Sequence, residues 1–90
     1  MISKKRMKEF LDKLEGEGGC NFRRVGGKTT WNCNAMTGRP LAHKVLRSMR
    51  VSAAGIKEIM DAAQKYGGYC DCEILLNAKP GLMRKAKKDV

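Results

Sequence analysis

Apolar residues recur with helical spacing at the start of the chain. They fall at i, i+3, i+4 and i+7, which places them on one face of a helix: Met7, Phe10, Leu11 and Leu14. Ser3 suits the N-cap, because its hydroxyl can accept a hydrogen bond from a backbone N–H of the first turn. The pattern predicts an amphipathic helix over residues 3–15, ended by the glycines that follow it.

Two further helices are predicted in the middle of the chain. The first covers residues 39–50, with Pro40 in its first turn, and its inner side carries Leu41, Val45, Ser48 and Met49. The second begins after Ser52 and runs to Tyr66, and its inner side carries Ile56, Ile59, Met60 and Ala63. Gly67 and Gly68 suit the end of this helix, because glycine readily adopts the left-handed conformation that closes a helix.

A β-hairpin is predicted around Gly26 and Gly27. Two consecutive glycines favour a two-residue turn of the primed type, which fixes the register of the flanking strands. Three cross-strand pairs then share one face: Phe22 with Trp31, Arg24 with Thr29, and Cys20 with Cys33. An aromatic pair beside a cysteine pair predicts that this face is buried.

Residues 69–77 alternate in a way that predicts a third strand. Cys70, Cys72, Ile74 and Leu76 fall on one face, and the residues between them fall on the other. Pro80 and Gly81 then break the pattern. The sequence thus predicts a single α+β domain over residues 1–78, followed by a basic tail over residues 79–90.

The predicted order of elements is α-β-β-α-α-β. A sheet with one apolar face must bury that face against other elements. The expected architecture is therefore a small three-stranded sheet with one face covered by the three helices.

Charge separates the middle of the chain from its flanks. The 90 residues carry a formal net charge of +10, and residues 20–50 contain no acid. The cations of this stretch are Arg23, Arg24, Lys28, Arg39, Lys44, Arg47 and Arg50. Basic residues concentrated on one surface are typical of proteins that bind polyanions.

On the predicted second helix, basic side chains form a stripe. Arg39, His43, Arg47 and Arg50 recur at i, i+4, i+8 and i+11, and the hairpin adds Arg23, Arg24 and Lys28. These residues favour a small non-catalytic protein that contacts the phosphates of RNA or DNA without reading sequence. The alternatives are a protein-interaction or regulatory module that binds an acidic partner, and a merely solvated face.

The four cysteines support more than one interpretation. The chain begins without an apolar leader and has no membrane-length apolar run, so we expect a cytoplasmic protein whose cysteines are thiols or metal ligands. They can be small core residues. They can also form a structural zinc site, either from Cys20, Cys33, Cys70 and Cys72 or with His43 in place of one of these cysteines. A thiol enzyme is the least favoured interpretation, because His43 is the only candidate base.

The stretch from Gly67 to Asn77 carries a distinctive motif. It reads Gly-Gly-Tyr-Cys-Asp-Cys-Glu, then an apolar run and an asparagine. It resembles the closing motif of a family of short uncharacterised prokaryotic proteins, a domain of unknown function. The resemblance also implies a metal site that combines the C-x-C pair with an upstream Cys-Asp-His element, whose counterpart here is Cys33-Asn34-Ala35.

Overall fold

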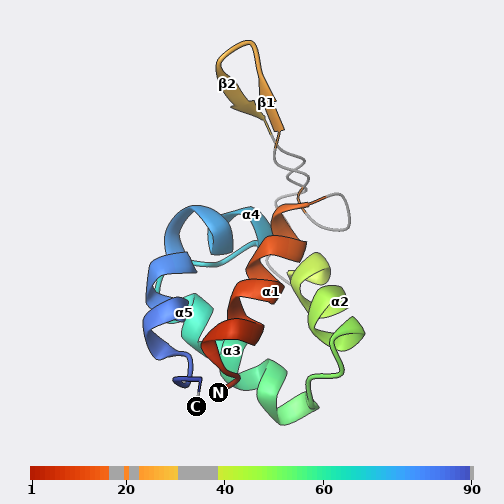
Figure 1. Cartoon of the computed structure of the whole chain (residues 1–90), viewed down its shortest axis with the longest axis vertical. Coiled ribbons are helices and arrows are strands. Elements are labelled where there is room, and N and C mark those ends of the chain that lie inside the picture. Colours follow the sequence, from red (N-terminus) through yellow and green to blue (C-terminus); the bar gives the residue numbers. More distant parts are fainter. Residues whose placement is uncertain (17–19, 21–22, 31–38, 90) are drawn as a thin grey trace.

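The computed structural model of the chain describes residues 1–16, 20, 23–30 and 39–89. Its elements are α1 (Lys4–Glu15), β1 (Arg23–Val25), β2 (Lys28–Thr30), α2 (Pro40–Ser48), α3 (Ala53–Lys65), α4 (Asp71–Glu73), the π-helix η1 (Ile74–Ala78) and α5 (Lys79–Lys85). The helices gather into one body, and the hairpin β1–β2 projects from one end of it (Figure 1). In the part of the chain that the structure describes, no helix has the length and apolar content needed to cross a membrane.

The first predicted helix is confirmed as α1. Its buried face consists of the predicted Met7, Phe10, Leu11 and Leu14, each at most 1% exposed. The Ser3 hydroxyl accepts a hydrogen bond from the Arg6 N–H at 3.2 Å, as expected of an N-cap. The helix packs against α2 and α5 and so lies at the centre of the body.

The two middle helices are confirmed as α2 and α3. Ser52 caps α3 by accepting a hydrogen bond from the Gly55 N–H at 3.1 Å, and the predicted inner residues of α3 are buried. On α2 the buried residues are Ala42, Val45 and Leu46, with Met49 just beyond the helix. The predicted inner residue Ser48 is exposed, because the face that meets α1 is rotated toward Leu46.

The hairpin has the register that the Gly26-Gly27 turn predicts. Arg24 pairs with Thr29, and Val25 pairs with Lys28, in antiparallel orientation. Both glycines have positive φ values, 57° and 81°, which a primed turn requires. The pairs that involve Phe22, Trp31 and Cys33 fall outside the described residues.

The predicted third strand is wrong, and with it the predicted α+β fold of a three-stranded sheet under three helices. Residues 71–85 form α4, η1 and α5 in succession. Among the described residues the only strands are β1 and β2, which pair with each other. The described body is therefore a bundle of helices, with α3 packed against η1 and α5.

Burial explains why a helix replaces the strand. The fully buried residues of this region, Ile74, Ala78 and Leu82, recur every four positions, and Cys70, which is 8% exposed, extends the same series toward the N-terminus. This spacing forms one helical face that continues past Pro80. A proline inside a helix clashes with the carbonyl four residues before it, and here the wider π turn of η1 directly precedes the turn that contains Pro80.

The basic C-terminal segment, which the sequence assigned to a tail over residues 79–90, packs on the body over residues 79–87. Lys79–Lys85 form α5, and Leu82 is fully buried. Beyond α5 the backbone of Lys87 pairs with the N-terminal segment: its N–H donates to Ile2 at 3.0 Å and its carbonyl accepts from Lys4 at 2.7 Å. The two ends of the described chain therefore lie side by side (Figure 1).

Candidate functional site

A groove between α2 and α3 contains two of the predicted phosphate-binding residues. Its volume is about 380 Å³, and its lining residues are His43, Arg47, Ala53, Ile56, Lys57 and Met60. Ile56 and Met60 are 8% and 4% exposed, so the edge of the hydrophobic core forms the apolar part of the lining. The α2–α3 groove therefore combines an apolar surface with basic side chains from both helices.

The basic side chains of the α2–α3 groove differ in their partners. Lys57 Nζ lies 2.8 Å from Asp61 Oδ2. The hydrogen bond to the Asp61 carboxylate, followed by its negative charge, raises the pKa of Lys57, so this amine stays protonated at neutral pH. Arg47 is exposed, and no carboxylate among the described residues pairs with it. The Arg47 guanidinium is thus the charge in the groove that an anionic ligand can engage without displacing a partner.

Arg39, the first residue of the predicted basic stripe, has an internal structural role. Its guanidinium Nη1 donates to the carbonyl oxygens of Met60 at 2.9 Å and Gly68 at 3.2 Å. These bonds tie the segment before α2 to α3 and to the residues that directly follow it. Nη1 of Arg39 is therefore engaged inside the protein, and phosphate binding by Arg39 stays a prediction.

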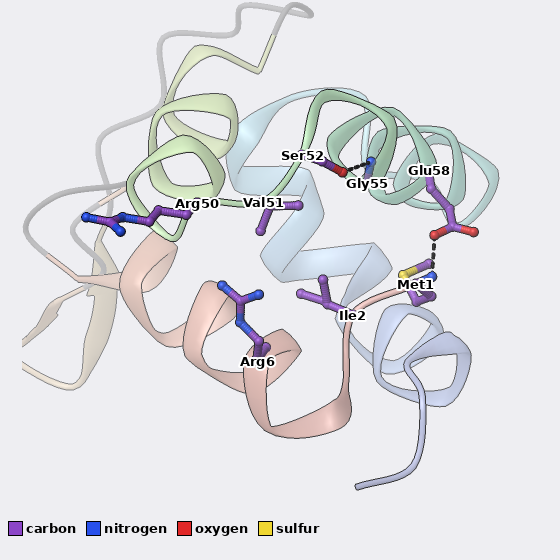
Figure 2. A pocket seen from close by; sticks show the side chains of 8 residues that line it. All are labelled: Met1, Ile2, Arg6, Arg50, Val51, Ser52, Gly55 and Glu58. Atoms are coloured by element: carbon purple, nitrogen blue, oxygen red, sulfur yellow. Dashed lines mark hydrogen bonds and ion pairs between the residues drawn. The ribbon is translucent and has the colours of Figure 1, made fainter.

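Arg50, the last residue of the stripe, lines a different pocket. This pocket has a volume of about 250 Å³ and is bounded by the N-terminal segment, α1 and the start of α3; its residues are Met1, Ile2, Arg6, Arg50, Val51, Ser52, Gly55 and Glu58 (Figure 2). Arg6 is held there by a hydrogen bond to the Met49 carbonyl, and the Arg50 guanidinium points away from the other lining side chains. The predicted stripe is thus divided between the α2–α3 groove, an internal bond and a second pocket.

The hairpin residues of the predicted site lie apart from the α2–α3 groove. Lys28 is exposed next to the turn, and Arg23 and Arg24 pair through their backbones with β2. The hairpin extends beyond the end of the helical body (Figure 1). These residues therefore do not extend the surface formed by His43 and Arg47.

Two of the four cysteines lie in contact. Cys70 Sγ and Cys72 Sγ are 3.3 Å apart, and the two residues are 8% and 5% exposed. On a straight strand alternate residues are about 6.5 Å apart, so the helical start at Asp71 is what brings the sulfurs together. Cys20 is also buried, whereas Cys33 lies outside the described residues.

The predicted zinc site is only partly described. The sulfur pair at 3.3 Å is closer than the roughly 3.8 Å between two sulfurs of one tetrahedral zinc ion, so zinc binding would require the pair to separate slightly. His43 belongs to the α2–α3 groove. Across residues 1–16, 20, 23–30 and 39–89, no three histidine, cysteine or acidic side chains form a group that could hold a metal ion. Zinc coordination that uses Cys33 stays a prediction.

Asp71, between the two cysteines, is the functional residue of this motif that the sequence interpretation missed. It is 3% exposed, and its carboxylate accepts hydrogen bonds from the backbone N–H groups of Leu41 at 3.1 Å and Ala42 at 2.9 Å. A signal was present in the sequence: Arg39 precedes Pro40 at the start of α2, and an arginine side chain has no acceptor to cap a helix. The free N–H groups of α2 therefore required an acceptor from another segment.

Comparison with known proteins identifies a family. A family model described as "Protein of unknown function (DUF2695)" matches residues 33–77. The matched region contains α2, α3, α4, all of η1 except its last residue, and the cysteine pair. No curated protein and no solved structure matches the chain.

Proposed function

We propose that this chain, which belongs to the DUF2695 family of proteins of unknown function, is a non-catalytic interaction module that binds an acidic segment of a partner protein in the α2–α3 groove. The observation that carries the proposal is the composition of that groove. It combines the apolar side chains of Ile56 and Met60 with the basic side chains of His43, Arg47 and Lys57. An acidic segment that also carries apolar anchors complements both parts of this surface.

The apolar part of the groove favours a peptide over a nucleic-acid backbone. Phosphates gain nothing from contact with Ile56 and Met60, whereas leucine-like anchors bury area there. Single-strand binders stack bases chiefly on Phe, Tyr and Trp rings, and the described lining of the groove contains none of these three; its planar side chains are His43 and Arg47. The division of the basic stripe also favours a peptide over a nucleic-acid backbone, because Arg39 and Arg50 do not line this groove and fewer cations are left there to contact phosphates.

Charge complementarity supports an acidic partner. The chain carries a net charge of +10, so an acidic segment is attracted over a distance of about a Debye length, 8 Å at physiological salt. Long-range attraction accelerates encounter, and contacts within the groove then select the partner. Affinity is therefore expected to fall with salt, but less steeply than for a ligand bound through phosphates alone.

The test is a selection from a random peptide library displayed on phage, followed by binding measurements with the enriched peptides carrying a fluorescein label. We expect enriched sequences to combine aspartate or glutamate with leucine, isoleucine or phenylalanine. Arg47→Glu is expected to lower the affinity for such a peptide by about tenfold or more, which corresponds to roughly 1.4 kcal/mol of binding free energy. Amide shifts on binding should concentrate on α2 and α3 in NMR spectra.

Lys88→Glu is the matched control, because it makes the same change of charge at an exposed position after α5. It should change affinity by no more than about twofold. Equal weakening by the two variants would contradict specific use of the groove. Binding of a labelled single-stranded RNA or duplex DNA that survives Arg47→Glu, with no acidic peptide enriched, would instead support the nucleic-acid function that the basic sequence predicts.

A further inference from the structure

The sulfur atoms of Cys70 and Cys72 lie in contact within the Gly67–Asn77 motif. Neither cysteine lines the α2–α3 groove. The sulfur–sulfur separation of 3.3 Å suits an S–H···S contact and exceeds the length of a disulfide, about 2.05 Å. From this juxtaposition we propose that Cys70 and Cys72 form a reversible dithiol–disulfide site. The inference is independent of the proposed peptide binding.

Little movement separates the dithiol from the disulfide. The sulfurs must approach by about 1.2 Å to reach bonding distance, through side-chain rotation together with a small adjustment of the backbone. Cys70 has extended backbone, with φ of −135° and ψ of 172°, and Cys72 lies in the helical turn that follows it. The backbone therefore changes from extended to helical between Cys70 and Cys72. This change places the two side chains on the same side of the chain.

The sequence spacing makes the bond easy to reverse. A disulfide stabilises a protein chiefly by closing a loop in the unfolded chain, and the stabilisation grows with loop length. Because only Asp71 separates the two cysteines, the loop is nearly as short as a disulfide loop can be. A bond that adds so little stability is readily reduced, which is typical of labile rather than structural disulfides.

The reaction we propose is exchange with a small disulfide, R–S–S–R, such as oxidised glutathione. Cys70 is 8% exposed and follows the exposed Tyr69, so its thiolate attacks one sulfur, releases R–S⁻ and forms a mixed disulfide. The Cys72 thiolate then attacks the Cys70 sulfur and releases the second R–S⁻. The two cysteine protons pass to the two released thiolates, so the protein loses two electrons and R–S–S–R becomes two R–SH.

Disulfide formation is expected to affect α2 through Asp71. Its carboxylate holds the N–H groups of Leu41 and Ala42, and it lies between the two sulfurs in sequence. Drawing the sulfurs together shifts the backbone on both sides of Asp71. The first turn of α2 is therefore the part of the described structure that responds first.

The test equilibrates the full chain in glutathione buffers of increasing oxidised fraction, alkylates the remaining thiols and digests the product with trypsin. The peptide from Tyr66 to Arg84 contains Cys70 and Cys72 and neither of the other cysteines, because Lys79 precedes a proline that blocks cleavage. We expect this peptide to pass from two alkyl groups to none, with the loss of two hydrogen atoms. Reduction should restore both sites of alkylation.

Two variants keep the test specific. Cys20→Ala with Cys33→Ala should retain the transition. Cys72→Ser should abolish it, because Cys70 can then pass only from an alkylated thiol to an unresolved mixed disulfide with glutathione, which adds the mass of one glutathione to the peptide. In NMR spectra the Leu41 and Ala42 amides should shift on oxidation of the unsubstituted chain. If the alanine variant does not fold, the peptide measurement on the unsubstituted chain still decides the question.

Three outcomes would overturn the proposal. The first is a peptide that keeps two reactive thiols across the whole series of buffers. The second is a disulfide that joins Cys70 or Cys72 to Cys20 or Cys33 instead. The third is a native mass that exceeds the denatured mass by one zinc ion, with no oxidation until the ion is removed; that result would assign the pair to a metal site.

Discussion

Asp71 caps a helix that begins some thirty positions earlier in the chain: its Oδ1 accepts a hydrogen bond from the Ala42 N–H at 2.9 Å. Oδ2 accepts a second bond from the Leu41 N–H at 3.1 Å. Arg39 bonds in the opposite direction, from the segment before α2 to the carbonyls of Met60 and Gly68. The two side chains together fasten α2 to the segment that ends α3 and begins α4, and so they position one wall of the α2–α3 groove.

Loss of the Asp71 carboxylate should therefore destabilise the whole fold. We expect Asp71→Ala to lower the free energy of unfolding by about 2–3 kcal/mol, because two backbone donors at a buried site lose their acceptors. The measurement is urea unfolding followed by circular dichroism. Asp61→Ala removes a carboxylate from an exposed pair with Lys57 and should cost no more than about 0.5 kcal/mol. Similar losses in the two variants would contradict the capping role.

The helices that the sequence predicted correctly are those whose signals are local. Ser3 and Ser52 each precede a helical run and cap it from a neighbouring position. The buried positions of α1 repeat with a period that only a helix satisfies. No knowledge of the rest of the molecule was needed for these elements.

The segment after Tyr69 was predicted wrongly because two periodicities compete within it. Cys70, Cys72, Ile74 and Leu76 alternate as in a strand, whereas Cys70, Ile74, Ala78 and Leu82 repeat as in a helix. Cys72 is buried as well, but beyond Ile74 burial follows the second set, since Leu76 is 53% exposed whereas Ala78 and Leu82 are fully buried. The helical set extends past Pro80, which the sequence interpretation treated as a break. The decisive contacts are made with α3, and a local pattern does not contain them.

The candidate site was only partly predictable for a similar reason. His43 and Arg47 were identified from their spacing on one helix. Lys57, Ile56 and Met60 join them only because α3 lies beside α2. The internal use of Arg39 likewise depends on carbonyls of Met60 and Gly68, which are distant in sequence.

The role of α5 can be tested with two leucines of opposite environment. Leu82→Ala should lower the free energy of unfolding by about 2–4 kcal/mol, because it leaves a cavity in the core. Leu76→Ala makes the same chemical change at a residue that is 53% exposed, and should stay within about 0.5 kcal/mol of the unsubstituted protein. Thermal unfolding of both variants provides the comparison. A neutral Leu82→Ala would mean that residues 79–90 are a tail after all.

Gly81 is predicted to be essential for the packing of α5 against Tyr66. A β-carbon added at this glycine would lie 2.5–2.7 Å from three ring carbons of Tyr66. We expect Gly81→Ala to cost about 1–3 kcal/mol, because the ring must leave its place in the interface. At Gly16 an added β-carbon finds its nearest neighbour at 3.6 Å, so Gly16→Ala is the control and should be nearly neutral.

A second variant separates the clash from other effects of the substitution in Gly81→Ala. Tyr66→Leu removes the ring, so adding Gly81→Ala to it should cost less than adding Gly81→Ala to the unsubstituted chain. The difference is the coupling free energy of a double-mutant cycle. An unchanged cost would place the strain elsewhere in α5.

The ion pair between the Met1 amino group and Glu58 should make the free energy of unfolding depend on pH in the acid range. The hydrogen bond from the Met1 amino group, and then its positive charge, lower the pKa of the Glu58 carboxyl, with smaller contributions from Lys87 and Lys85. A carboxyl whose pKa is lower in the folded state than in the unfolded state adds stability above its unfolded pKa. That stability disappears as the pH falls through the folded pKa.

The difference in unfolding free energy between the unsubstituted chain and Glu58→Gln should therefore be constant near neutral pH and shrink below about pH 4. The effect is expected to be small, because the Glu58 side chain is 52% exposed and solvent screens the pair. Urea unfolding at a series of pH values between about 3 and 7 measures it. Acetylation of the Met1 amino group is the control: it removes the positive charge, so Glu58→Gln in the acetylated chain should lose most of this pH dependence. A difference that stays the same across the series would contradict the ion pair.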